Sequence, residues 1–362
     1  MNNISNCVLI KILLYIPEKE RRETKASLKL TCKHLYKAIR SIFPNRMVKL
    51  SSIDAINDFC SSLQRDSSWC FEINGLQVNE ESSSQLSKAQ PDLNLRTEYS
   101  HLYKNLPAIF KLCSNLNHLS VSARKDDCFI TYFTIVRDNT CYLKNLQRLD
   151  APGLGRCSKR TAKFYLDTIL NIKDNITQLE INKNTLCKVI VTDFGRLDAF
   201  TKLFPHLHHL KIRANKVWKK ESVHFVELIE SNKELKTFSF ISKKTFEICM
   251  VSDTDLKEKR ITNSNSLERV VLSTVSLHIN TLRYIIAKCK RLHHFELYVS
   301  KGIAPFQLQQ TPTTMYQFIQ HHLVPFIEDI AIVNLNIHFG GSNQRLQMQK
   351  GQETKFILKS LP

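Results

Sequence analysis

The sequence predicts an α/β solenoid in which short parallel strands alternate with helices in units of about 30 residues. First, the pattern L-x-x-L-x-L, with any bulky apolar residue allowed at each L, occurs eight times between Leu116 and Leu335. Second, successive copies begin 30, 30, 31, 28, 32, 25 and 38 residues apart. Third, several of the intervening segments have apolar residues at helical spacing. A unit of this size cannot bury its apolar face alone, so neighbouring units must stack. A βαβ sheet that repeats by coincidence is the alternative, and eight copies in register disfavour it.

The eight copies define the expected strands. They are LNHLSV (116–121), LQRLDA (146–151), ITQLEI (176–181), LHHLKI (207–212), LKTFSF (235–240), LERVVL (267–272), LHHFEL (292–297) and IAIVNL (330–335). Apolar residues at i, i+3 or i+4 and i+7 predict helices between them, at 159–170, 196–204, 221–231, 280–289 and 313–323.

Three domains are expected along the chain. Residues 1–47 form a small helical module, residues 48–338 form the solenoid, and residues 339–362 form a C-terminal cap or tail. Within the solenoid, 51–63 reads as a helix and WCFEINGL (69–76) as a first, irregular strand. Residues 79–98 lack periodicity and are rich in Ser, Gln and acidic residues, which predicts a loop inserted into an early repeat.

The N-terminal stretch ISNCVLIKILLYI (4–16) does not look like an export signal. Lys11 splits its apolar run, no basic residue precedes the run, and no small-residue cleavage site follows. No stretch of the chain reaches the roughly 18 apolar residues that a bilayer span needs. We therefore expect a cytoplasmic and/or nuclear protein that does not enter a membrane.

The charge balance is strongly basic, with 52 Lys and Arg against 33 Asp and Glu, a net charge of +19. The first 50 residues contain 11 basic and 3 acidic residues, so +8 lies there and +11 over the other 312. Such a field favours acidic protein partners, nucleic acid or anionic surfaces.

No motif predicts catalysis, a metal or a cofactor. The 11 cysteines have no CxxC spacing, which indicates reduced thiols in small apolar sites. The pairs His208–His209, His293–His294 and His321–His322 are adjacent residues, which on a strand point to opposite faces and do not converge on one ion. The segment 151–160 lacks the Lys-Ser/Thr end of a phosphate loop and is expected to be a turn.

Two resemblances to known families follow from these residues. The repeats resemble a divergent form of the leucine-rich repeat, and two copies end with the extra Asn of that pattern, at Asn184 and Asn215. The N-terminal module resembles the F-box, which begins LP-x-E-I-L-x-x-I-L-x-Y-L and later has L-x-L-V-C-K-x-W. Here Ser5, Cys7, Thr31 and Leu35 stand where that family has Pro, Glu, Val and Trp.

The resemblance implies a non-catalytic substrate-recognition subunit of an SCF-type (Skp–cullin–F-box) ubiquitin ligase. The F-box would bind a Skp-type adaptor and, through it, a cullin-RING ligase. The residues assigned to adaptor binding are Ile4, Ser5, Val8, Leu9, Ile12, Leu13, Ile16, Leu28, Leu30, Cys32, Leu35 and Tyr36. The hydrophobic pattern of residues 4–16 agrees with adaptor binding, because a helix that is apolar on two sides needs two partners. The alternative is that the repeats cover it as an N-terminal cap.

The repeats would bind a target protein, whose identity the sequence does not give, through the positions that flank the second L of each motif. The residues assigned to this role are His118, Arg148, Asp150, Gln178, Glu180, His209, Lys211, Arg213, Arg269, His294, Glu296 and Tyr298, and the same register exposes Thr237, Ser239 and Val271. These positions are polar and of mixed sign, without the aromatic ladder or basic stripe of a single-stranded nucleic-acid site. A basic repeat module that binds RNA or a protein scaffold, with no role in ubiquitylation, is the competing hypothesis.

Overall fold

The computed structural model describes most of the chain between residues 46 and 304, and three later strands. The described residues are 46–51, 53–65, 67, 70, 73–79, 95–123, 126–152, 157–182, 184–214, 225–242, 266–278, 285, 289, 291–304, 334–339, 344–349 and 357–360. The residues assigned to adaptor binding, between Ile4 and Tyr36, lie outside these ranges. The chain divides into two compact units: residues 1–122 with 138–146, and residues 123–137 with 147–362.

The described residues of unit 1 form three parallel strands in chain order, β1 (Arg46–Leu50), β2 (Ile73–Asn79) and β3 (His118–Ser122). Its helices are α4 (Ile53–Arg65), α5 (Leu95–Leu112) and the short 3-10 turn η2 (Thr140–Tyr142). Helix α4 packs on α5, where the amide of Asn105 donates to the Oδ1 of Asn57. Ile56, Leu106 and Phe110 are fully buried in this layer.

Three boundaries in unit 1 differ from the sequence prediction. Strand β1 was not expected, and it spans the boundary placed at residue 47. Strand β2 begins at Ile73, so the irregular strand expected from Trp69 starts four residues later. Helix α5 begins at Leu95, inside the loop expected at 79–98, because the sequence from that residue has apolar side chains at helical spacing.

Unit 2 is a mixed α/β structure built on a parallel sheet. Its strands are β4 (Arg148–Leu149), β5 (Gln178–Ile181), β6 (His209–Ala214), β7 (Thr237–Ser242), β8 (Arg269–His278), β9 (His294–Ala304) and β10 (Asn334–Phe339), paired in chain order. Strands β11 (Gln344–Gln349) and β12 (Ile357–Ser360), within the segment expected as a cap or tail, continue the sheet in antiparallel pairing.

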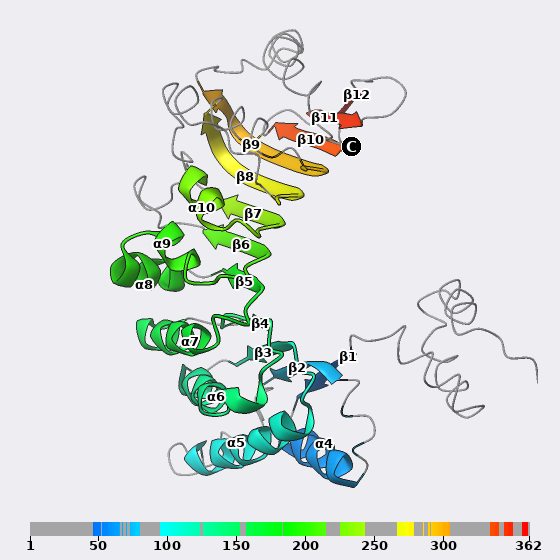
Figure 1. Ribbon diagram of the computed structural model, residues 1–362, viewed down its shortest axis with the longest axis vertical. Coiled ribbons are helices and arrows are strands. Elements are labelled where there is room, and N and C mark those ends of the chain that lie inside the picture. The colour runs from blue at the N-terminus through cyan, green and yellow to red at the C-terminus, as the bar shows by residue number, and fades with distance from the viewer. Residues whose placement is uncertain are drawn as a thin grey trace, which may run out of the picture. The chain divides into compact units, whose positions relative to one another are not determined.

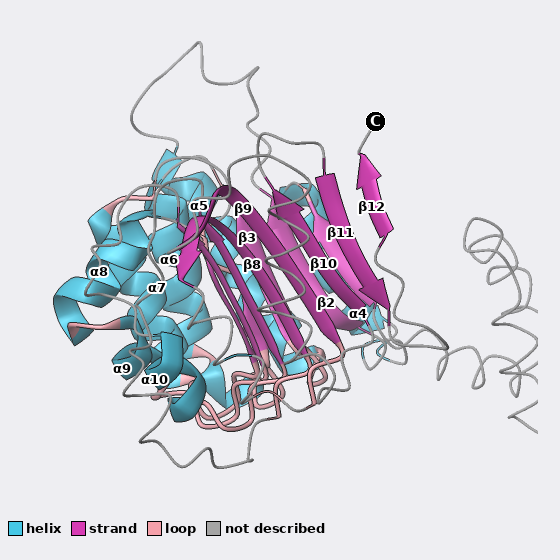
Figure 2. Cartoon of the chain, turned by 90° about the horizontal axis from the view of Figure 1, so that it is seen from above, coloured by secondary structure: helices cyan, strands magenta, loops and turns pink. Residues whose placement is uncertain are grey.

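The helices of unit 2 lie on one face of this sheet (Figure 1, Figure 2). They are α6 (Asp126–Asp138, whose last residue belongs to unit 1), α7 (Lys159–Asn171), α8 (Asn184–Phe194), α9 (Leu197–Thr201) and α10 (Phe225–Ser231). The helices expected at 159–170, 196–204 and 221–231 correspond to α7, α9 and α10. The helices expected at 280–289 and 313–323 lie outside the described ranges, apart from residues 285 and 289.

Two apolar rows run across the sheet and form the core. The second L of successive motifs aligns in register as Leu179, Leu210, Phe238, Val270 and Phe295, and the third as Ile181, Ile212, Phe240, Leu272 and Leu297. Every one of these side chains is at most 2% exposed. The structure thus confirms the mixed α/β class and the parallel sheet that the motif predicts.

The backbone just before each strand also follows one pattern. The carbonyl of Gln147 accepts hydrogen bonds from the N–H groups of Thr177 and Gln178 at 3.0 and 3.1 Å. The carbonyls of Thr177, His208, Lys236 and Glu268 each accept two N–H groups from the next strand in the same way. This shared pairing holds the strands in one register although the motifs are unequally spaced in the sequence.

Local signals explain where the helices of unit 2 begin and end. The Ser158 side chain accepts from the Thr161 N–H at 3.1 Å and caps α7. Gly195, at φ +72°, lies between α8 and α9 in the left-handed region that glycine adopts without strain.

Buried Tyr165 of α7 packs edge-on against Phe133 of α6, with ring centroids 5.3 Å apart.

Candidate functional site

The face of the unit 2 sheet opposite the helices carries the polar residues of the motifs, and we call it the open face. It consists of the side chains that alternate with the buried rows on β4–β9: Arg148, Asp150, Gln178, Glu180, His209, Lys211, Arg213, Thr237, Ser239, Arg269, Val271, His294, Glu296 and Tyr298. Because successive residues of a strand point to opposite sides, burying every second apolar residue places these side chains on the other side.

Eleven of the twelve residues predicted to bind a target therefore share one face. The twelfth, His118, lies on β3 in unit 1. Strand pairing places Gln178 beside Arg148 on one side and beside His209 on the other. The row continues through Thr237 and Arg269 to His294, so side chains 25 to 32 residues apart in sequence lie next to one another on the sheet.

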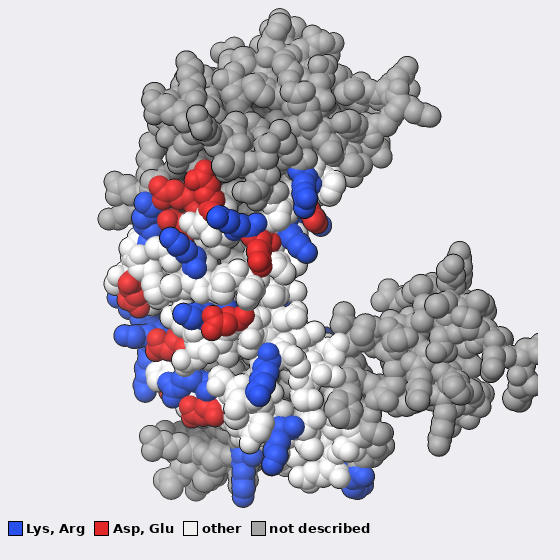
Figure 3. Space-filling view, viewed as in Figure 1, with Lys and Arg blue, Asp and Glu red and all other residues white. Residues whose placement is uncertain are grey.

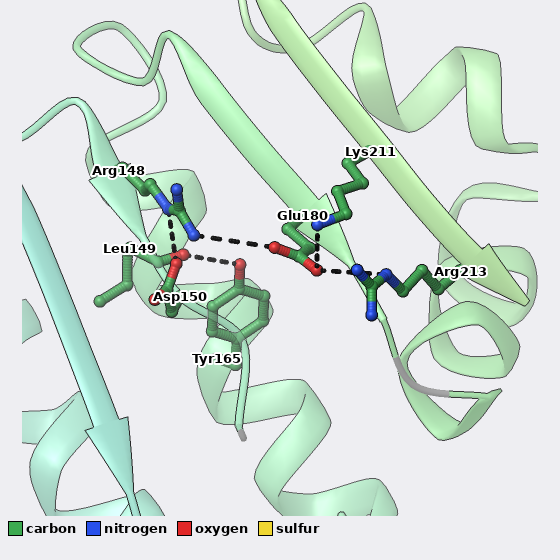
Figure 4. A network of polar contacts seen from close by, with 7 residues as sticks. All are labelled: Arg148, Leu149, Asp150, Tyr165, Glu180, Lys211 and Arg213. Atoms are coloured by element: carbon green, nitrogen blue, oxygen red, sulfur yellow. Dashed lines mark hydrogen bonds and ion pairs between the residues drawn. The ribbon is translucent and has the colours of Figure 1, made fainter. Parts of the chain in front are cut away.

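Glu180 is the centre of an ionic cluster at one end of the open face (Figure 4). Its carboxylate lies 3.7 Å from Nη2 of Arg148, 3.3 Å from Nζ of Lys211 and 3.8 Å from Nε of Arg213. Arg148 also donates from Nε to Oδ1 of Asp150 at 2.7 Å. The Glu180 side chain is only 20% exposed, so the three cations compensate for its removal from water.

A second ionic group lies on β8 and β9. The Nε2 of His294 and the Oε1 of Glu296 are 2.6 Å apart, and the Nη2 of Arg269 is 4.0 Å from the same oxygen. The Arg269 side chain is 54% exposed, whereas that of Glu296 is 22% exposed. The carboxylate is thus held mainly by His294, and the guanidinium extends toward solvent.

His209 on β6 and Thr237 on β7 lie between the two groups in the strand order. The Nδ1 of His209 and the Oγ1 of Thr237 are hydrogen bonded at 2.7 Å. Burial, and then the nearby His208 ring, lower the pKa of His209 below its usual value. The neutral imidazole is therefore favoured in the folded protein.

The adjacent residues His208 and His209 have different polar partners. His208 precedes strand β6, and its Nε2 lies 3.3 Å from Oε2 of Glu234. His209 is hydrogen bonded to Thr237 on the open face instead. The two rings are nearly perpendicular, with centroids 6.3 Å apart. Within the described ranges, no group of three or more His, Cys, Asp or Glu residues could hold a metal ion.

A groove of about 350 Å³ runs across β4–β8 on the open face. Six of the predicted residues line it: Arg148, Gln178, Glu180, His209, Lys211 and Arg269. Thr237, Ser239 and Val271 also line it. The motif register exposes these three as well, although they are not among the twelve residues assigned to target binding. Asp150, Arg213, His294, Glu296 and Tyr298 are not among the groove-lining residues.

The fold and the open face define this chain as a mixed α/β protein with a polar groove on a parallel sheet. Among the helices in the described part of the chain, none is both long enough and apolar enough to cross a membrane. In the view of Figure 3, acidic and basic side chains are interspersed over much of the described surface, and only basic ones appear toward its lower end. The open face is therefore a polar surface that carries both acidic and basic side chains.

Comparison with known proteins does not assign this chain to a family. No family model matches the chain, and no curated protein matches it. A chain in a crystal structure of a yeast Rad7 and Elc1 complex is similar at 12% sequence identity and a TM-score of 0.37, over 82% of this chain and 69% of that chain. A TM-score this low does not establish a shared fold, so the match carries no argument about function.

Proposed function

We propose that this chain is a non-catalytic target-recognition subunit of an SCF-type ubiquitin ligase. Its F-box-like segment, residues 1–47, would bind a Skp-type adaptor, and its divergent leucine-rich repeats would hold a target protein on the open face. The observation that carries the recognition role is the groove, where one face of consecutive strands collects six residues that the motif register predicts as contacts. The adaptor role rests on the F-box resemblance of the sequence.

The chemistry of the groove supports binding more than catalysis. His209 and Thr237 are hydrogen bonded, as a base and a nucleophile would be. Such a pair also needs a third group that orients the imidazole. Glu180, on the strand beside His209, is held by Arg148, Lys211 and Arg213 instead.

A rigid face suits a receptor that works by proximity. The strands that carry the groove residues are fixed by two buried apolar rows, so the polar side chains start from a backbone that needs little ordering on binding. A target held there would be presented to a ubiquitin-charged enzyme elsewhere in the ligase, and the rate gain would come from orientation alone.

Copurification with a Skp-type adaptor tests the proposal. The full chain is co-expressed with the adaptor, as wild type and as the double variant Leu9→Asp with Ile12→Asp. We expect the wild type to retain the adaptor through size-exclusion chromatography, and the double variant to lose at least about ten-fold in affinity, because two buried charges oppose docking.

The matched control replaces two exposed helix residues, Lys163→Asp on α7 and Lys188→Asp on α8. This control should keep the adaptor and the melting temperature of the wild type. Adaptor binding that survives the Leu9 and Ile12 changes, or a wild type that binds no adaptor, would refute the proposed role in ubiquitylation.

The net charge of +19 keeps one rival function in view, a basic module that binds RNA. RNA binding through phosphate contacts weakens steeply with salt, with a log–log slope near the number of contacted phosphates. A steep slope in RNA titrations of the full chain, together with no adaptor binding, would favour this rival.

A further inference from the structure

We propose that the groove binds an acidic segment of the target protein through its carboxylates, with Arg269 contacting one of them. This inference rests on the proposed function, because it takes the open face as the surface that holds a target. It adds the chemistry of the segment, the spacing of its acidic residues and the side chain that makes the main contact.

The charged side chains lining the groove are mostly cationic. Among the described residues that line it, three are basic, Arg148, Lys211 and Arg269, and Glu180 is the one that is acidic. Glu180 is compensated internally by Arg148 and Lys211, with Arg213 just outside the groove. A ligand therefore meets a surface with net positive charge, and its acidic side chains complement it.

The cations differ in how far they are engaged within the chain. The Arg148 side chain is 35% exposed and serves both Asp150 and Glu180. The Lys211 side chain is 38% exposed and lies 3.3 Å from Glu180. Arg269 is 54% exposed, and its ion pair with Glu296 is the longest of these, at 4.0 Å. Arg269 therefore has the most capacity to bind an incoming carboxylate with two parallel hydrogen bonds.

The spacing of the cations suits a series of separate carboxylates. Lys211 is on β6 and Arg269 on β8, with β7 between them. Two strand spacings amount to about 10 Å, so a separate carboxylate can lie over each cation. The same span equals about three residues of extended chain, so acidic residues at every third position would meet successive cations.

The floor between the cations suits an extended backbone. Thr237 and Ser239 contribute small hydroxyl side chains on β7, and Val271 on β8 adds an apolar contact next to Arg269. Hydroxyls both donate and accept, so they can pair with either type of backbone group of a segment that crosses the strands.

Fluorescence anisotropy with the full chain tests this inference. The probe is a labelled peptide with three Glu residues, each separated by two Ser residues, and the reference peptide has Gln at the same positions. We expect the Glu peptide to bind at least about ten-fold more tightly than the Gln peptide, because only the carboxylates are charged. Equal binding of the two peptides would overturn the inference.

Two substitutions should move the affinity in opposite directions. Arg269→Glu should weaken binding of the Glu peptide at least ten-fold, and Lys163→Glu on exposed α7 is the matched charge change that should leave it unaltered. Glu180→Gln keeps the shape of the side chain and frees three cations, so it should tighten binding several-fold. Weaker binding by Glu180→Gln would mean that the carboxylate contacts a basic ligand, which contradicts the proposal.

Further probes separate the other possible occupants. A peptide with phosphoserine at the Glu positions that binds while the Glu peptide does not would overturn the choice of carboxylates. Binding of an RNA oligonucleotide in place of both peptides would also overturn it. Circular dichroism melts confirm that each variant is folded, and Arg269→Gln repeats the test without charge reversal. Adaptor copurification is a separate readout, so failure of peptide binding and failure of the ligase role are distinguishable.

Discussion

Asn232 provides the sharpest test of how the repeats of unit 2 are held together. It is 5% exposed, directly after α10, and its Nδ2 donates to the carbonyl of Leu228 at 2.7 Å and to Oγ1 of Thr201 at 3.1 Å. The backbone carbonyl of Asn232 also accepts the Leu235 N–H that closes the turn before β7. The Asn232 side chain thus ties α9 to the turn of the next motif.

Replacing this residue by alanine should destabilise the protein by about 2–4 kcal/mol. The change removes two buried hydrogen bonds of about 1 kcal/mol each, and it leaves a carbonyl and a hydroxyl without this donor. For a unit of this size, that loss corresponds to a fall in melting temperature of about 5–15 °C. Asn232→Cys should lose less, because cysteine fills part of the space and already occupies the corresponding buried turn positions at Cys113 and Cys289.

The assay is urea and thermal unfolding followed by circular dichroism. The matched control is Asn145→Ala, since Asn145 also donates from Nδ2 to a carbonyl, that of Ser114 at 2.9 Å, but is exposed. We expect this control to remain within about 0.5 kcal/mol of the wild type. If Asn232→Ala were no more destabilising than Asn145→Ala, the buried amide would not be a structural tie, and the reasoning would be wrong.

Two further predictions concern titration and thiol reactivity. Burial, with His208 nearby, lowers the pKa of His209, so the folded protein favours the neutral imidazole. The stability that this preference contributes is lost as pH falls from about 6.5, the ordinary pKa of histidine, through the lower pKa of His209 in the folded protein. His209→Gln should therefore lose less stability than wild type between pH 7.5 and 5 in urea titrations; equal losses would contradict the shift. Burial raises the pKa of the Cys113 and Cys187 thiols to about 12, so a maleimide should label exposed Cys141 in the native protein and reach these two only after unfolding. Peptide mass spectrometry would show this order, and early labelling of Cys113 or Cys187 would refute it.

The motif register predicted much of the open face because alternation along a strand needs only local sequence. Once Leu210 and Ile212 are recognised as buried, His209 and Lys211 must point the other way. The sequence could not rank these residues as contacts. Whether a cation is engaged depends on what lies across the strands, and the pairing of Lys211 with Glu180 joins residues 31 positions apart.

The misplaced boundaries in unit 1 have a physical cause as well. Helix α5 follows a Ser-rich and acidic stretch, so its first turn was read as part of a loop. Strand β1 is five residues long and precedes the first motif, so no repeat marks it. Periodicity identifies elements that recur, and it says little about elements at the ends of the pattern.

The sequence by itself determined the class of the protein, because the spacing of apolar residues dictates which side chains must leave water and hence the parallel strands and the helices between them. The tertiary structure decided which polar side chains meet. It surrounds Glu180 with Arg148, Lys211 and Arg213 and leaves Arg269 extended toward solvent. The physical reason is that hydrophobicity and the alternation along a strand can be read from neighbouring residues, whereas charge pairing depends on distances between strands that are far apart in the chain.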